Sequence, residues 1–251
     1  MSKLNTNSNA YIIIYSAILV VIVAFLLAFV YKALKPMQDA NVELDTKKQI
    51  LYSLNIRNLD GAEAETKYAE LVNDTLDFAG QKILMAEIEE EPIIIFEMKG
   101  MGLWGGISGY MSVRLDPEKG GFAVYGAYFN HESETAGLGA EIKDSQEWQE
   151  KFIGKRIIKE GPDGKDHVAL SIVKKVEDPE TQVDVVTGAT LTSNGVDEMI
   201  KRTFGIWTGE YDLGIDESEM EKMLIKSLYK DSDISDAELE KMIKVRKVKE
   251  E

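Results

Sequence analysis

The stretches "PIIIFEMKG" (92–100), "GLWGGISGYMSVRLD" (102–116) and "GFAVYGAYFNH" (121–131) have the composition of neighbouring β-strands. Each is rich in β-branched and aromatic residues, which fit a pleated surface, and glycines mark bends within and between them. Strands that are grouped, and flanked by helices without regular alternation, are typical of an α+β fold. We therefore predict an α+β domain with a mainly antiparallel sheet in the middle of the chain.

Helical patterns lie on both sides of this region. Residues 41–59 carry apolar side chains at helical spacings, and residues 62–83 are expected to hold a second helix. A short helix is expected from Ser145, a strand over 166–176, and helical spacing returns over 196–204. These elements would pack around the sheet, and the first of them would connect the domain to the segment that precedes it.

That preceding segment, residues 10–31, contains no charge in 22 residues. As a helix it would span roughly 33 Å, enough to cross a bilayer core of about 30 Å. Tyr11, Tyr15 and Tyr31 lie toward its ends, where tyrosine rings favour the membrane interface. A signal peptide would have a shorter apolar region and a small-residue cleavage site, so we predict a retained single-span anchor in the lipid bilayer.

The predicted organisation has four parts. A short N-terminal segment, residues 1–9, precedes the transmembrane helix at 10–31. The α+β domain occupies 37–215, and a charged, helical tail occupies 216–251. The basic residues that flank the span, Lys3 before it and Lys32 and Lys35 after it, mildly favour a cytoplasmic domain.

Composition excludes several classes of function. The net charge of −15 argues against a nucleic-acid partner, which needs a basic face. The chain has no cysteine, which excludes disulfides, thiolate zinc sites, iron–sulfur ligation and cysteine nucleophiles. Its two histidines exclude a three-histidine metal site and leave a hydrolase as a distant third interpretation. We do not interpret Glu134 and Glu141 as an acid–base pair, because nothing nearby indicates a bond to be hydrolysed.

Hydroxyl groups crowd into "VDVVTGATLTSNGVDEMI" at 183–200. The pattern predicts a strand that ends near Asp184, a tight turn at 187–190 and a helix that begins near 192–194. A helix start presents unpaired N–H groups and partial positive charge, which suit a phosphate. Composition alone favours the simpler interpretation, in which Thr192, Ser193 or Asn194 caps the helix.

The motif "DVVTGAT" at 184–190 matches the Asp-x-x-(Ser/Thr)-Gly-Ala-Thr pattern at which flavin transferases attach FMN. The chain resembles the C subunits of sodium-translocating NADH:quinone reductases over more than this motif. The N-terminal span, "GMGLWGGISGY" (100–110), "HESETAGLGAEI" (131–142) and "VTGATLTSNGV" (186–196) follow in that family's order. The resemblance implies a covalent FMN cofactor held by an FMN-binding domain.

Carried over residue by residue, the resemblance implies that Thr190 is esterified to the FMN phosphate. It implies that Asp184 and Thr187 complete the motif read by the transferase. The other residues expected around the cofactor are Gly188, Ala189, Leu191, Thr192, Thr135, Leu138, Trp104 and Lys174. No catalytic residue and no metal ligand is expected in this chain.

The resemblance implies an electron-transfer subunit of a membrane complex that oxidises NADH, reduces quinone and exports sodium. The expected partners are the other subunits, a flavin transferase and the bilayer, with the domain on the outer, periplasmic side of the cytoplasmic membrane. This expected location conflicts with the lysine distribution around the span, which mildly favours a cytoplasmic domain. The alternatives are the flavin subunit of the related ferredoxin:NAD oxidoreductase complex and, from another class, a membrane-anchored scaffold without cofactor.

Overall fold

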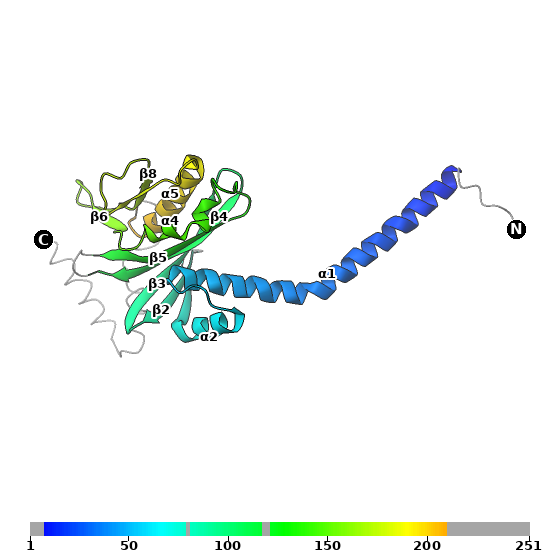
Figure 1. Ribbon diagram of the computed structural model, residues 1–251, viewed down its shortest axis with the longest axis horizontal. Coiled ribbons are helices and arrows are strands. Elements are labelled where there is room, and N and C mark those ends of the chain that lie inside the picture. Colours follow the sequence, from blue (N-terminus) through cyan, green and yellow to red (C-terminus); the bar gives the residue numbers. More distant parts are fainter. Residues whose placement is uncertain (1–7, 79–80, 117–120, 210–251) are drawn as a thin grey trace. The chain divides into compact units, whose positions relative to one another are not determined.

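The computed structural model describes residues 8–78, 81–116 and 121–209 of the chain. The chain divides into two compact units, residues 1–46 and 47–251. Helix α1 (Asn9–Ser53) forms the first unit and continues into the second (Figure 1). The expected membrane span and the first part of the expected connecting helix thus belong to one continuous helix, with Pro36 inside it.

Helix α1 is long and apolar enough to cross a membrane, with a mean hydropathy of 3.1 over its most apolar window. The large apolar side chains of that window are exposed, as lipid-facing side chains are. The helix ends at Ser53, earlier than the predicted residue 59, because Asn55 and Asn58 adopt left-handed backbone angles of 61° and 62°. Asparagine tolerates this conformation, but a right-handed α-helix cannot continue through a residue that adopts it.

The second unit is built on an antiparallel sheet of five strands in the order β1-β2-β3-β4-β5. The strands are β1 (Val72–Phe78), β2 (Gln81–Ile88), β3 (Glu91–Met101), β4 (Gly106–Leu115) and β5 (Phe122–His131). The three quoted stretches therefore form the three consecutive strands β3, β4 and β5. The α+β class and the antiparallel sheet are confirmed.

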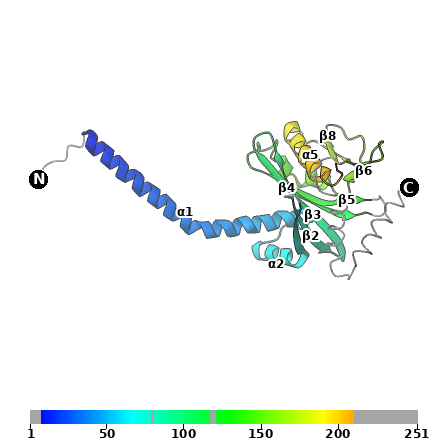
Figure 2. The same cartoon turned by 180° about the vertical axis from the view of Figure 1, so that it is seen from behind.

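Each face of the sheet is covered, because alternate side chains point to opposite sides. On one face Phe96 and Met111 pair across β3 and β4 and join the core beneath α5 (Thr190–Gly205). On the other face Ile95 pairs with Ser112, whose hydroxyl donates to the carbonyl of Ser53 at the end of α1. Figures 1 and 2 show α5 on one side of the sheet and α2 (Gly61–Leu71) on the other.

The chain after β5 returns across the α5 face in short elements. These are α3 (Glu141–Asp144), α4 (Gln146–Glu150), β6 (Ile158–Glu160), β7 (Asp166–Val168), β8 (Ser171–Val173) and β9 (Gln182–Asp184). Strands β8 and β9 form a small parallel pair, and β6 and β7 an antiparallel one. Phe129 of β5 packs against Trp148 and Phe152, with ring centroids 5.1–5.5 Å apart within this cluster.

Two further element predictions were wrong in extent. The helix expected over 62–83 ends at Leu71, because Val72 leaves the helical region and the following residues pair with β2. The strand expected over 166–176 is broken between β7 and β8, which pair with different neighbours. The expected helical tail, residues 216–251, lies outside the described residues.

Replacing Phe152 with alanine should destabilise the second unit by about 3–5 kcal/mol, because the ring is fully buried and its removal leaves a cavity in the aromatic cluster. The neighbouring Ile153 is 45% exposed, so Ile153→Ala should cost under about 1 kcal/mol. Urea unfolding followed by tryptophan fluorescence measures both. Equal losses would contradict the placement of Phe152 in the core.

Candidate functional site

The hydroxyl-rich segment forms a strand, a turn and a helix start. Strand β9 ends at Asp184, as predicted, and the N–H of Ala189 donates to the carbonyl of Val186 at 3.0 Å to close the turn. Gly188 has a φ of +79°, which glycine adopts without strain. Helix α5 begins at Thr190, earlier than the predicted 192–194, so Thr190 itself stands at the positive end of the helix.

The hydroxyls at this helix start have different partners. Thr192 donates to Oε2 of Glu134 at 2.7 Å, and the hydroxyl of Ser193 accepts from the N–H of Val186 at 3.0 Å. Neither serves as the expected cap, since the N-cap position is Ala189, which makes no side-chain cap bond. The Thr190 hydroxyl, on a half-buried residue, has no hydrogen-bond partner among residues 8–78, 81–116 and 121–209.

A pocket of about 260 Å³ opens beside Thr190. Three segments line it: the β3–β4 loop, the loop after β5, and the turn with the first residues of α5. The lining residues are Leu103, Trp104, Glu134, Thr135, Leu138, Gly139, Gly188, Ala189, Thr190, Leu191 and Thr192. Most of the residues expected around the cofactor are therefore brought together, although they come from positions as far apart as 104 and 192.

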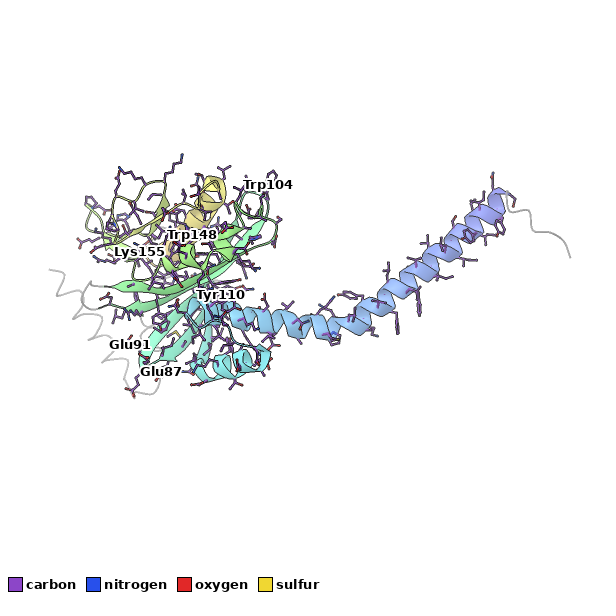
Figure 3. All side chains as sticks on the ribbon, viewed as in Figure 1. Glu87, Glu91, Trp104, Tyr110, Trp148 and Lys155 are labelled. Carbon is purple, nitrogen blue, oxygen red and sulfur yellow. The ribbon has the colours of Figure 1, made fainter. Side chains whose placement is uncertain are left out.

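Hydrogen bonds from the 132–134 segment fix the β3–β4 loop at the rim of the pocket. Oε1 of Glu134 accepts from the N–H of Trp104 at 2.9 Å, and the Ser133 hydroxyl donates to the Trp104 carbonyl at 2.9 Å. The N–H and the carbonyl of Trp104 are thus both hydrogen-bonded, while the residue as a whole is 66% exposed. Figure 3 shows Trp104 at the edge of the domain, near α5.

The loops approach so closely that side chains on certain glycines would collide. A Cβ on Gly195 of α5 would lie 2.2 Å from the carbonyl oxygen of Met101, so the helix packs directly on the β3–β4 loop backbone. A Cβ on Gly188 would lie 2.8 Å from Cδ2 of Leu138, and there the positive φ also favours glycine. These contacts bring the N-terminus of α5 against both of the other pocket segments.

Three residues predicted around the cofactor lie outside the pocket lining. Asp184 forms an ion pair with Lys151 at 2.9 Å, and its carbonyl accepts from Nε1 of Trp148 at 2.8 Å. Thr187 is exposed in the turn. Lys174 is exposed just after β8, so the structure does not bring its charge to the pocket.

The sequence prediction missed Leu103, Glu134 and Gly139 as lining residues. From the sequence, Glu134 was considered only as half of an acid–base pair, an interpretation that was rejected. The position of Glu134, next to the predicted contact Thr135, could have indicated that it lines the pocket. Its hydrogen-bond partners, Trp104 and Thr192, are distant in sequence and could not be predicted in this way. His131 ends β5, and its Nδ1 accepts from the N–H of Glu134 at 3.2 Å.

The charges around the pocket suit a ligand that is mostly apolar. Among the described lining residues, Glu134 is the one ionisable group, and the rim is formed by Leu103, Trp104, Leu138 and Leu191. The last four are 44–66% exposed. Within the described residues no group of three His, Asp or Glu side chains is placed to hold a metal ion. The pocket thus offers an apolar rim, one carboxylate and the Thr190 hydroxyl at a helix N-terminus.

Comparison of the sequence with known protein families identifies the class of domain. Residues 102–204, which contain all the pocket segments, match the model of the FMN-binding domain. The chain thus carries an FMN-binding domain with an α+β fold, together with an N-terminal apolar helix.

Individual relatives specify the family. The solved structure of the C subunit of the Na⁺-translocating NADH-quinone reductase from Parabacteroides distasonis is 33% identical, with a TM-score of 0.58; the match covers 68% of this chain and 93% of that one. The corresponding C subunit of Haemophilus ducreyi is 28% identical over 82% of this chain and 93% of its own length. That of Neisseria meningitidis serogroup A is 32% identical over 61% of this chain, which spans about half (51%) of that relative. The chain belongs to the family of C subunits of Na⁺-translocating NADH-quinone reductases.

Replacing Gly195 with alanine should cost about 1–3 kcal/mol in unfolding free energy, because the new methyl group would overlap the Met101 carbonyl and push α5 from the β3–β4 loop. Asn194→Ala, one residue earlier on the exposed side of the same helix, should change stability by less than about 0.5 kcal/mol. Urea titration of the two variants measures the difference. A Gly195→Ala chain as stable as the wild type would show that the helix does not pack this closely.

Proposed function

We propose that this chain is an electron-transfer subunit that carries FMN through a phosphoester to the Thr190 hydroxyl. The observation that supports it is the position of this hydroxyl: it lines the pocket, stands at the first residue of α5 and has no partner among the described residues. A phosphate at this point would meet the unpaired N–H groups and the positive end of the helix. The "DVVTGAT" motif places the same threonine last in the attachment pattern.

The neighbouring hydroxyls are poorer attachment points. The Thr192 and Ser193 side chains are buried, and each is already bonded within the protein. Thr187 is exposed and lies outside the pocket lining, so a phosphate there would leave the flavin ring away from the apolar rim. Asp184, also outside the pocket, remains available on the surface as a recognition residue for a flavin transferase.

The apolar rim would hold the flavin ring. Leu138 and Leu191 offer flat apolar contact, Trp104 an aromatic face, and Thr135 a hydroxyl for the polar edge of the ring. When bound, FMN supplies one- and two-electron redox chemistry. Because the rim residues are substantially exposed, part of the ring would stay open to a redox partner.

A covalent bond to FMN suits a pocket with this charge. The ionisable residue in its described lining is Glu134, which carries the same sign of charge as the FMN phosphate. Free FMN would therefore gain no ion pair from the lining and would be held weakly. An ester to Thr190 removes the loss of cofactor by dissociation.

In the assembled complex, electrons derived from NADH would pass through this FMN on their way to quinone, and the complex would export sodium. The other subunits would supply the NADH and quinone sites, so this chain would not be a complete enzyme by itself. Helix α1 would anchor it in the cytoplasmic membrane, with the domain on the outer, periplasmic side. The family resemblance carried by the attachment motif implies that side.

Thr190→Val should abolish covalent flavin, because valine has nearly the same shape and no hydroxyl. The variant and the wild type are coexpressed with a flavin transferase, denatured, and examined for ultraviolet-excited fluorescence on the protein band and for the mass of the peptide. Thr192→Val is the matched control and should keep its flavin, since the Thr192 hydroxyl is committed to Glu134. A fluorescent Thr190→Val band would refute the attachment site, and a colourless wild type would favour the scaffold without cofactor.

The side of the membrane can be read by cysteine labelling, because the chain has no cysteine of its own. A Lys165→Cys chain, changed at an exposed turn, should react with a membrane-impermeant maleimide in intact spheroplasts. Ser2→Cys, before the span, should react only after the membrane is permeabilised. The reverse pattern would place the domain in the cytoplasm, as the lysine distribution favours.

A further inference from the structure

Glu134 joins the three segments that build the pocket. It belongs to the loop after β5, its Oε1 accepts from the Trp104 N–H of the β3–β4 loop at 2.9 Å, and its Oε2 accepts from the Thr192 hydroxyl of α5 at 2.7 Å. The residue is 8% exposed, so these bonds are largely shielded from water. The neighbouring loops leave room for the carboxylate, because a Cβ on Gly102 or Gly139 would lie 2.4 or 2.3 Å from one of its oxygens.

Both side-chain oxygens of Glu134, a residue of formal negative charge, act as hydrogen-bond acceptors. Burying such a charge is costly unless hydrogen bonds compensate it. Two donors do so here, and Oε2 is bonded to the third residue of α5, within the first turn where the helix dipole favours negative charge. The structure thus places one carboxylate in the lining of a pocket whose other described lining residues are uncharged.

We propose, on the basis of the FMN site proposed above, that Glu134 is a positioning residue for the flavin. Its carboxylate holds the Trp104 loop and the start of α5 at a fixed separation around the ring. Its negative charge also makes it harder to add electrons to a ring at close range, which lowers the midpoint potential of the bound flavin. One side chain therefore sets both the shape of the pocket and the potential of its cofactor.

Two substitutions of Glu134 separate the effect of its hydrogen bonds to Trp104 and Thr192, which bridge the pocket segments, from the effect of its charge. In Glu134→Gln the amide oxygen can still accept from Trp104, and the amide nitrogen can donate to the Thr192 oxygen, so the bridge remains while the charge is lost. Glu134→Ala removes both. Glu132→Gln is the matched control: it also removes one negative charge two residues away, but Glu132 is exposed and outside the pocket lining. Oε2 of Glu132 accepts from the N–H of Gly106 at 3.2 Å, and the glutamine oxygen can still accept that bond.

The test uses the full chain, flavinylated by coexpression and purified in detergent, with two measurements. Spectroelectrochemical titration should give a more positive midpoint potential for Glu134→Gln and Glu134→Ala, and the wild-type potential for Glu132→Gln. The fluorescence of the native bound flavin should rise in Glu134→Ala alone, since the quenching Trp104 would no longer be held beside the ring.

The outcomes distinguish the parts of the proposal. A Glu134→Gln potential equal to that of Glu132→Gln would overturn the electrostatic role. Unchanged flavin fluorescence in Glu134→Ala would overturn the positioning role, and if that variant fails to fold, the Glu134→Gln potential still decides the role of the charge. A wild-type chain without FMN would overturn the proposed function and this proposal together, whereas flavinylated variants identical to the wild type would overturn this proposal alone.

Discussion

Alternate side chains of a β-strand face opposite sides, and in this sheet both sides are apolar. Ile94 and Ile95, adjacent on β3, are both fully buried, one toward α5 and the other toward the end of α1. Two separate covers are therefore required, and their positions determine much of the remaining structure. The last turns of α1, the helix that begins in the apolar segment, cover one face, while α5, which begins at the hydroxyl cluster, covers the other.

The pocket follows from how α5 is placed on its face. Because Gly195 lets the helix touch the backbone at Met101, the start of the helix lies next to the β3–β4 loop that carries Trp104. The loop after β5 completes the lining and contributes Glu134. A cofactor bonded to Thr190 would thus lie where three segments meet, and a shift of any one of them would change its surroundings.

The crowd of hydroxyls around the turn has a physical explanation that a helix cap does not give. Ser193 fixes the backbone of the turn through Val186, and Thr192 binds the buried carboxylate of Glu134. The Thr190 hydroxyl is left without a partner in the described part of the chain, which is why we propose it as the attachment point. The three neighbouring hydroxyls therefore differ in their surroundings, and only their tertiary partners distinguish them.

Features that depend on neighbouring residues could be predicted from the chain alone: the strands from Glu91 to His131, the apolar helix and the turn at Gly188. These follow from side-chain shape, hydropathy and local backbone preference, which act over a few residues. The folded arrangement was needed to learn that α5 begins at Thr190, that Lys174 lies outside the pocket and that Glu134 bridges its walls. The bridge depends on contacts between segments 30 to 58 residues apart, and no local pattern encodes which distant donor a buried carboxylate will meet.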